Sequence, residues 1–174
     1  MDYPYESLSY VARLEFKDAH GLDARFHCYQ RIRVLAPELT HVWHRLWGSG
    51  DQLFDYAAPG THVVRVVRDD GRSVVVSELD RVAVAGDIIE LHSIRRIHHG
   101  FKDHREAWEY IPFTPTERAR VTIAFPIGKD PENISVGASS GTSTPLVHRP
   151  GTKELTLAIT SPVVGSLYRA EWSW

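Results

Sequence analysis

The stretch Pro162-Val-Val-Gly-Ser-Leu-Tyr-Arg-Ala-Glu-Trp-Ser-Trp174 decides the fold, because a turn signal in it leads directly into an alternating run. Tyr168, Ala170, Trp172 and Trp174 share one parity, and the residues between them are polar. An extended strand would therefore place the aromatic side chains on one face. Burial of each ring is worth on the order of 2 kcal/mol or more, so we expect this segment to be a paired strand that completes a sheet.

The residues that lead into this strand, Pro162 to Tyr168, resemble the tyrosine corner of immunoglobulin-like and fibronectin type III sandwiches. In that motif a tyrosine just after a turn forms a hydrogen bond with upstream backbone, so the resemblance implies such a bond for Tyr168. The cysteine and tryptophan spacing of immunoglobulin domains is absent. The resemblance supports a sandwich and carries no function with it.

Length and composition bound the kind of protein this is. The 174 residues can close one substantial core, and no linker-like stretch divides them, so we expect a single domain over residues 1–174. A net charge of −2 gives no global field that would attract nucleic acid or an anionic membrane. No signal-peptide pattern occurs, and no apolar run approaches the roughly 20 residues of a membrane span. We expect a cytoplasmic protein with no nucleic-acid or membrane partner.

Alternating segments along the chain predict short strands. They are residues 7–16, 22–35, 63–67, 73–76, 82–84, 88–94, 108–113, 119–125 and 155–159, which turn residues separate. Asp70 and Gly71 predict a hairpin turn. With the terminal strand, the pattern predicts an all-β, antiparallel β-sandwich of the immunoglobulin or fibronectin kind, with about nine or ten strands. A closed β-barrel is the alternative architecture.

Segment 22–35 has a nearly continuous apolar face. Cys28 lies on it, and we expect this residue, the only cysteine, to be a buried apolar side chain rather than a nucleophile. Gln30 is the one residue that breaks the face.

Segment 39–47 has a helix-like pattern. Its apolar residues recur at i, i+3, i+4, i+7 and i+8, with Pro37 before them and Gly48 after them. A strand that alternates from Leu39 to Trp47 is the other interpretation. We predict a short helix.

Motifs that would indicate an enzyme are weak. Gly137-Ala-Ser-Ser-Gly141 matches the G-x-S-x-G nucleophile elbow, but no helix pattern follows it and no Asp follows Asp130. Ten histidines occur, none with the spacing of a metal-binding motif. Phosphate-loop and dinucleotide fingerprints are absent. We expect no catalytic residue, no metal and no cofactor. A small β-fold enzyme with dispersed histidine and acidic residues is an alternative.

A basic, histidine-rich stretch is the candidate binding site. We predict it as an irregular connection between two strands, with the binding residues His92, Arg95, Arg96, His98, His99, Phe101, Lys102, His104 and Arg105. Basic groups around an aromatic ring can hold an acidic segment or a phosphate. A solvated connection is the other interpretation.

These patterns together favour a binding function over catalysis. We predict a non-catalytic module that recognises another macromolecule, most simply a protein, through an acidic or phosphate-bearing group. A carrier with an apolar cavity lined by Trp43, Trp47 and Trp108 is the alternative from a third class.

Overall fold

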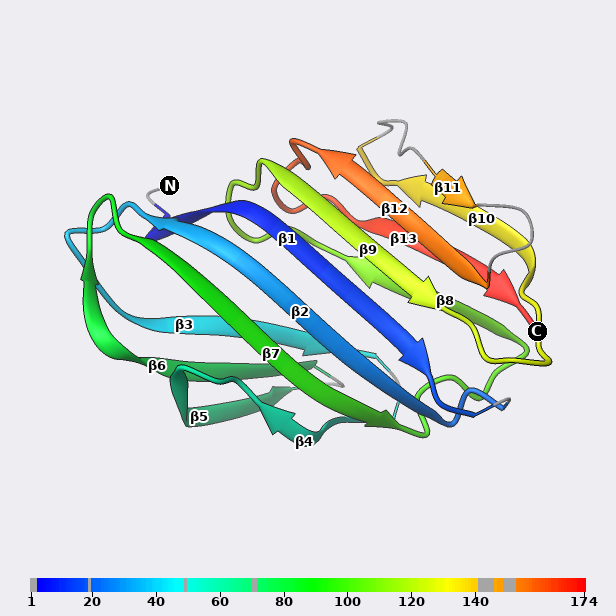
Figure 1. Ribbon diagram of the computed structural model, residues 1–174. Coiled ribbons are helices and arrows are strands. Elements are labelled where there is room, and N and C mark those ends of the chain that lie inside the picture. Colours follow the sequence, from blue (N-terminus) through cyan, green and yellow to red (C-terminus); the bar gives the residue numbers. More distant parts are fainter. Residues whose placement is uncertain (1–2, 19, 49, 70–71, 141–145, 149–152) are drawn as a thin grey trace.

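The computed structural model describes residues 3–18, 20–48, 50–69, 72–140, 146–148 and 153–174, and the elements in these ranges are β-strands (Figure 1). The strands are β1 (Tyr5–Phe16), β2 (Asp23–Val34), β3 (Glu38–Trp47), β4 (Asp51–Ala57), β5 (Thr61–Asp69), β6 (Arg72–Val84), β7 (Ile88–His98), β8 (Arg105–Tyr110), β9 (Arg118–Ala124), β10 (Glu132–Ala138), β11 (Leu146–His148), β12 (Glu154–Thr160) and β13 (Tyr168–Ser173). Over these ranges, no helix has the length and apolar character that crossing a bilayer requires.

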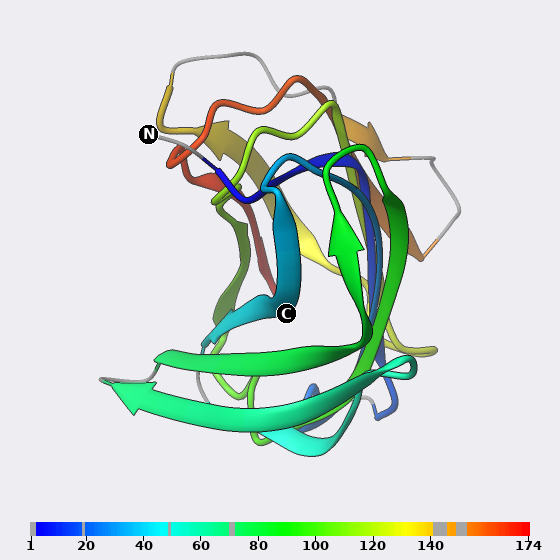
Figure 2. The same cartoon turned by 90° about the vertical axis from the view of Figure 1, so that its left-hand side faces the viewer.

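The strands form one large sheet and two small ones. The large sheet has the order β11-β12-β9-β1-β2-β7-β4, and the small sheets have the orders β10-β13-β8 and β3-β6-β5. Both small sheets lie on the same side of the large sheet, as the turned view in Figure 2 shows. The sandwich therefore has one continuous layer facing a divided layer.

Each small sheet covers its own hydrophobic cluster. Under β10-β13-β8, large-sheet residues such as Leu14 and Ile97 pack with Tyr168 and Trp172. Under β3-β6-β5, residues such as Ile32 pack with side chains from β3 and β6. Because β2 alternates with a period of two, its inner side chains contribute to both clusters.

The C-terminal strand is paired and buried, as the alternation predicts, and it is the central strand of its sheet. β13 lies between β10 and β8, and its inward side chains are fully buried, with Trp172 at 0% exposure. The Tyr168 hydroxyl accepts a hydrogen bond from the Val163 backbone N–H at 2.8 Å. The bond expected from the tyrosine-corner resemblance is confirmed.

The predicted helix at 39–47 is wrong, because this segment is strand β3, paired with β6. A β-bulge between Leu39 and His41 shifts the register there. After the bulge Val42 and Leu46 are buried at alternate positions, whereas Leu39 lies three residues before Val42. The extra residue of the bulge turned a period of two into an apparent helical spacing.

The β-sandwich prediction is confirmed, and the alternative barrel is wrong because the three sheets are not closed on each other. The pairing is antiparallel except between β1 and β9, which run parallel. Strand β4 was missed because its burial does not alternate cleanly along the sequence. Strand β10 was missed although its half-buried residues alternate with exposed ones. The predicted turn at Asp70 and Gly71 lies outside the described residues.

Candidate functional site

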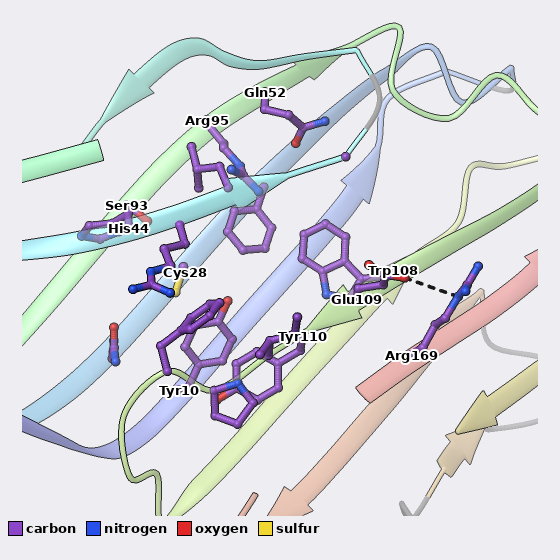
Figure 3. Close-up of a pocket in the computed structure, with 18 of the residues that line it drawn as sticks. Tyr10, Cys28, His44, Gln52, Ser93, Arg95, Trp108, Glu109, Tyr110 and Arg169 are labelled. Atoms are coloured by element: carbon purple, nitrogen blue, oxygen red, sulfur yellow. Dashed lines mark ion pairs between the residues drawn. The ribbon is translucent and has the colours of Figure 1, made fainter. Parts of the chain in front are cut away.

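A cavity of about 780 Å³ lies on the inner face of the large sheet, between the two small sheets (Figure 3). Strands β1, β2 and β7 form its floor, through the residues Tyr10, Phe26, Cys28, Gln30, Ser93 and Arg95. Strand β3 of one small sheet and strand β8 of the other border it on two sides. The volume is within the range of about 300–1,000 Å³ that is typical of small-ligand sites.

Strand register places the floor residues next to one another. On β2 and β7, Phe26 pairs with Arg95, and Cys28 pairs with Ser93. Paired residues in an antiparallel sheet project from the same face, so all four side chains point inward. The polar floor residues therefore form one cluster on an otherwise apolar surface.

Arg95 is the most unusual residue of the floor. It is only 4% exposed, and its Nε and Nη1 atoms have no hydrogen-bond partner among the described residues. Its guanidinium carbon lies 4.6 Å from the centre of the Phe26 ring. On the β8 side, Trp108 stacks on Phe26 with ring centres 5.0 Å apart, and its buried indole N–H is also unpartnered among these residues.

The ionisable groups around Arg95 are neutral at pH 7. Burial raises the pKa of Cys28 to about 12 and that of Tyr56 to about 12, and it raises the pKa of Tyr10 well above its usual value. Burial, with the Arg95 charge adding to it, lowers the pKa of His44 to about 4. Burial also lowers the pKa of Arg95 to about 10, which leaves it charged. Arg95 is thus the one charged side chain on the cavity floor.

Exposed aromatic and charged residues form the rim of the cavity. Trp43 is 44% exposed and Phe113 is 38% exposed. The Arg45 guanidinium lies 4.0 Å from the centre of the Phe113 ring. On the opposite side Arg169 forms ion pairs with Glu109 at 3.6 Å, drawn dashed in Figure 3, and with Glu171 at 2.8 Å. The rim can therefore contact both apolar and polar surface.

The predicted binding stretch is divided between the two faces of the large sheet. The expectation of an irregular connection is wrong for residues 92–98, because β7 continues to His98. Successive side chains of a strand point to opposite faces, so Arg95 lies inside while Arg96 lies outside. Outside, Arg96 pairs with Asp23 at 2.8 Å and with Asp55 at 3.4 Å.

The other predicted binding residues are dispersed in the same way. On the outer face, the His92 ring stacks on a tyrosine of β2 at 4.0 Å and the His98 ring contacts Phe54 at 4.2 Å. Phe101 is buried in the core and, with Arg105, lines the cavity. The remaining three, His99, Lys102 and His104, are exposed. Of the predicted residues, Arg95, Phe101 and Arg105 line the cavity. On the outer face, Arg96 and His98 lie together, each in contact with Asp23 and Phe54.

Sequence reasoning missed most of the cavity, although a signal for it was present. Gln30 breaks the apolar face of β2, and Ser93 and Arg95 break the inner face of β7. Two adjacent strands with polar residues at neighbouring inward positions indicate a place where no second sheet covers them. Of the tryptophans expected to line a carrier cavity, Trp43 and Trp108 do line it. The side chain of Trp47 lies outside the described part of the structure.

The residues of the weak enzyme motifs have structural contacts. The Ser139 hydroxyl accepts a hydrogen bond from the Leu167 backbone N–H at 2.9 Å, and Gly141 lies outside the described residues. Glu154 forms an ion pair with Arg13 at 2.7 Å. Cys28 is buried, as predicted. Within the described ranges, no group of three or more His, Cys, Asp or Glu side chains is placed to hold a metal ion.

The fold and the cavity define a β-sandwich that has a ligand-sized hollow in its divided layer. A search with the sequence found no matching family model and no matching curated protein. Among solved structures, the fold is similar to a putative protease from Parabacteroides distasonis, with a TM-score of 0.57 at 9% identity over 98% of this chain and 40% of that chain. It is also similar to an M1 zinc metallopeptidase from Deinococcus radiodurans, with a TM-score of 0.50 at 16% identity over 98% of this chain and 43% of that one. The chain thus spans about two fifths of each of these chains, and the likeness shows a shared fold.

Proposed function

We propose that this chain is a non-catalytic recognition module, which binds another protein at the rim of the cavity and takes an acidic group of that protein into it. The observation that carries the proposal is Arg95, a buried cation whose Nε and Nη1 donors have no partner among the described residues. Buried charges are costly unless they are paired, so such a group favours an anion supplied from outside.

The structural neighbours support a role as one part of a larger assembly. In the putative protease and the M1 zinc metallopeptidase, the region similar to this chain accounts for about two fifths of the length. A β-sandwich of this kind accompanies other chain segments in those proteins. We infer that this chain likewise works alongside a partner, in the same chain or in another one.

The rim has the composition of a protein contact surface. Exposed tryptophan, phenylalanine and arginine side chains, here Trp43, Phe113 and Arg45, are the residue types enriched where proteins bind one another. The ion-paired residues of β8 and β13 on the other side add a polar margin. A partner that contacts both sides would cover the cavity.

Site-specific cross-linking tests the proposal. The photoreactive residue p-benzoylphenylalanine replaces Phe113 at the rim or, as the control, Ile127, which is 90% exposed and does not line the cavity. In extract of its own cells, we expect a protein adduct from position 113 and none from position 127. Equal adducts from both positions, or an adduct from position 127 alone, would contradict binding at the rim.

Carriage of an apolar ligand is the second candidate function. The observation that favours it is the aromatic lining, where Tyr10, Phe26, Trp108 and Tyr110 surround the same hollow. A carrier of neutral ligands would bind an uncharged dye such as Nile red with the same affinity in wild-type protein and in Arg95→Met. A recognition module for an acidic group would instead bind that group more weakly in Arg95→Met than in wild-type protein.

A further inference from the structure

We propose that the cavity binds the carboxylate of an organic acid with an apolar body, and that Arg95 is the anchor for this carboxylate. The inference rests on the proposed function in that it concerns the same cavity, and it names the chemistry of the group that enters. It follows from the unpartnered donors at the cavity, from the uncompensated charge of Arg95 and from the aromatic residues that line the cavity.

Three hydrogen-bond donors at the cavity have no acceptor among the described residues. Both Arg95 Nε and Arg95 Nη1 are buried without a partner among the described residues, and so is Trp108 Nε1. A guanidinium in water would have all its N–H groups hydrogen-bonded, so each unpartnered donor is a cost of folding. A ligand with acceptor oxygens at this position removes that cost when it binds.

Register and ring contacts hold the guanidinium in one place. Arg95 is the strand partner of Phe26, and its guanidinium lies over the Phe26 ring at 4.6 Å. Phe26 is itself held by stacking with Trp108. Because these residues are positioned before any ligand enters, little ordering cost remains for binding. This arrangement is a built site rather than a mobile surface arginine.

The charge of the site matches a single negative charge. The ionisable acidic groups that interact with Arg95 are Tyr10, Cys28 and Tyr56, and burial keeps all three protonated. None of them can serve as the counter-ion at neutral pH. One cation in a region of low dielectric is compensated by a monoanion, whereas a phosphate dianion would leave a buried charge of its own. A carboxylate is therefore favoured over a phosphate group.

The walls define the rest of the ligand. Tyr10 stacks on Tyr110 at 4.7 Å on one side of the floor, and Phe26 stacks on Trp108 at 5.0 Å on another. Aromatic side chains of this kind bury the apolar part of a ligand and offer no polar partner to it. The ligand that fits combines one carboxylate with an aromatic or aliphatic body. Such a group is either a free acid or the C-terminal residue of a peptide.

Calorimetric titration with matched probes tests this inference. The protein is unfolded in guanidinium chloride and refolded to remove bound acids, and then titrated with 3-phenylpropionate, with its neutral amide and with phenyl phosphate. We expect the acid to bind, and we expect the amide and the phosphate each to bind about 10-fold or more weakly. An amide that binds as tightly as the acid, tighter binding of phenyl phosphate, or no binding of the acid would overturn the inference.

Variants of neighbouring residues assign the anchor. Arg95→Met is expected to weaken binding of 3-phenylpropionate about 10-fold or more, while Arg96→Met, on the outer face, should leave it unchanged. Equal effects of the two substitutions would show that Arg95 is not the anchor for the carboxylate. If Arg95→Met does not fold, the comparison of acid with amide on wild-type protein still decides the inference.

Peptides distinguish the two sources of the carboxylate. An acetylated tripeptide that ends in phenylalanine is compared with its C-terminal amide and with 3-phenylpropionate. Tighter binding of the free-acid peptide assigns a chain terminus, and tighter binding of 3-phenylpropionate than of either peptide assigns a small molecule. If both peptides bind more tightly than 3-phenylpropionate and bind equally well, a role for the carboxylate is contradicted. Cross-linking at Phe113 without acid binding would overturn this inference alone, and acid binding without a cross-linked partner would overturn only the proposed protein partner.

Discussion

Replacement of Arg95 by methionine should stabilise the ligand-free protein, although Arg95 is only 4% exposed. Methionine keeps the methylene stem and its packing but removes the charge. An arginine paired within the fold would behave in the opposite way, since loss of one partner from a buried pair is strongly destabilising. The sign of the change in stability therefore reports whether Arg95 has an internal counter-ion.

The size of the effect follows from the burial of the guanidinium. Burial lowers the pKa of Arg95 from 12.5 to about 10. At 1.36 kcal/mol per pH unit, this corresponds to a destabilisation of about 3 kcal/mol. Loss of the contact with the Phe26 ring offsets about 1 kcal/mol of the gain. We expect the free energy of unfolding to rise by about 2 kcal/mol in Arg95→Met.

Chemical denaturation of refolded protein measures this change. Because the folded protein binds the Arg95 proton less strongly than the unfolded chain does, the penalty is fully present below the folded pKa of about 10 and declines as the pH rises toward 12.5. The gap between variant and wild type should thus stay constant from about pH 6 to about pH 9. Arg96→Met is the control and should not raise the stability. A less stable Arg95→Met protein would show that Arg95 is paired within the fold, and it would refute the reasoning.

Three further predictions concern the rest of the fold. Tyr168→Phe should lower the free energy of unfolding by about 1–2 kcal/mol through loss of the bond to Val163, and a change near zero in urea denaturation would make Tyr168 an ordinary core residue. Deletion of residues 167–174 removes the central strand of β10-β13-β8 together with the fully buried Trp172, so it should abolish cooperative thermal unfolding; a truncated chain that melts sharply near the full-length temperature would contradict this. Burial lowers the pKa of His44 from 6.5 to about 4. Between these two pH values the unfolded chain binds more protons than the folded protein, so His44 lowers the free energy of unfolding as the pH falls from 6.5 to about 4. His44→Gln should therefore flatten the dependence of stability on pH between these values, by about 0.7 kcal/mol per pH unit after discounting by half for partial solvent exposure, and an unchanged slope would exclude a contribution from His44.

Alternation along the chain was enough to predict the all-β class, the two faces of β1, β2 and β9, and the burial of the C-terminal strand. These features depend on a period of two, which each segment carries in its own sequence. The hydrogen bond of Tyr168 was implied by a short motif for the same reason, because its partner lies only five residues away. Features that depend only on residues close in the sequence can therefore be predicted without the tertiary structure.

The cavity and its arginine were decided only by the tertiary structure. The sequence shows that Arg95 and Arg96 face opposite sides of a strand, but not which of them faces the inside. That depends on where β3 and β8 lie relative to β7. The sequence also predicted β3 as a helix, because its bulge gives the apolar residues a helix-like spacing. A gap between two sheets is a property of strands far apart in the chain. The basic stretch was therefore predicted as a surface, although one of its residues, Arg95, is buried on the cavity floor.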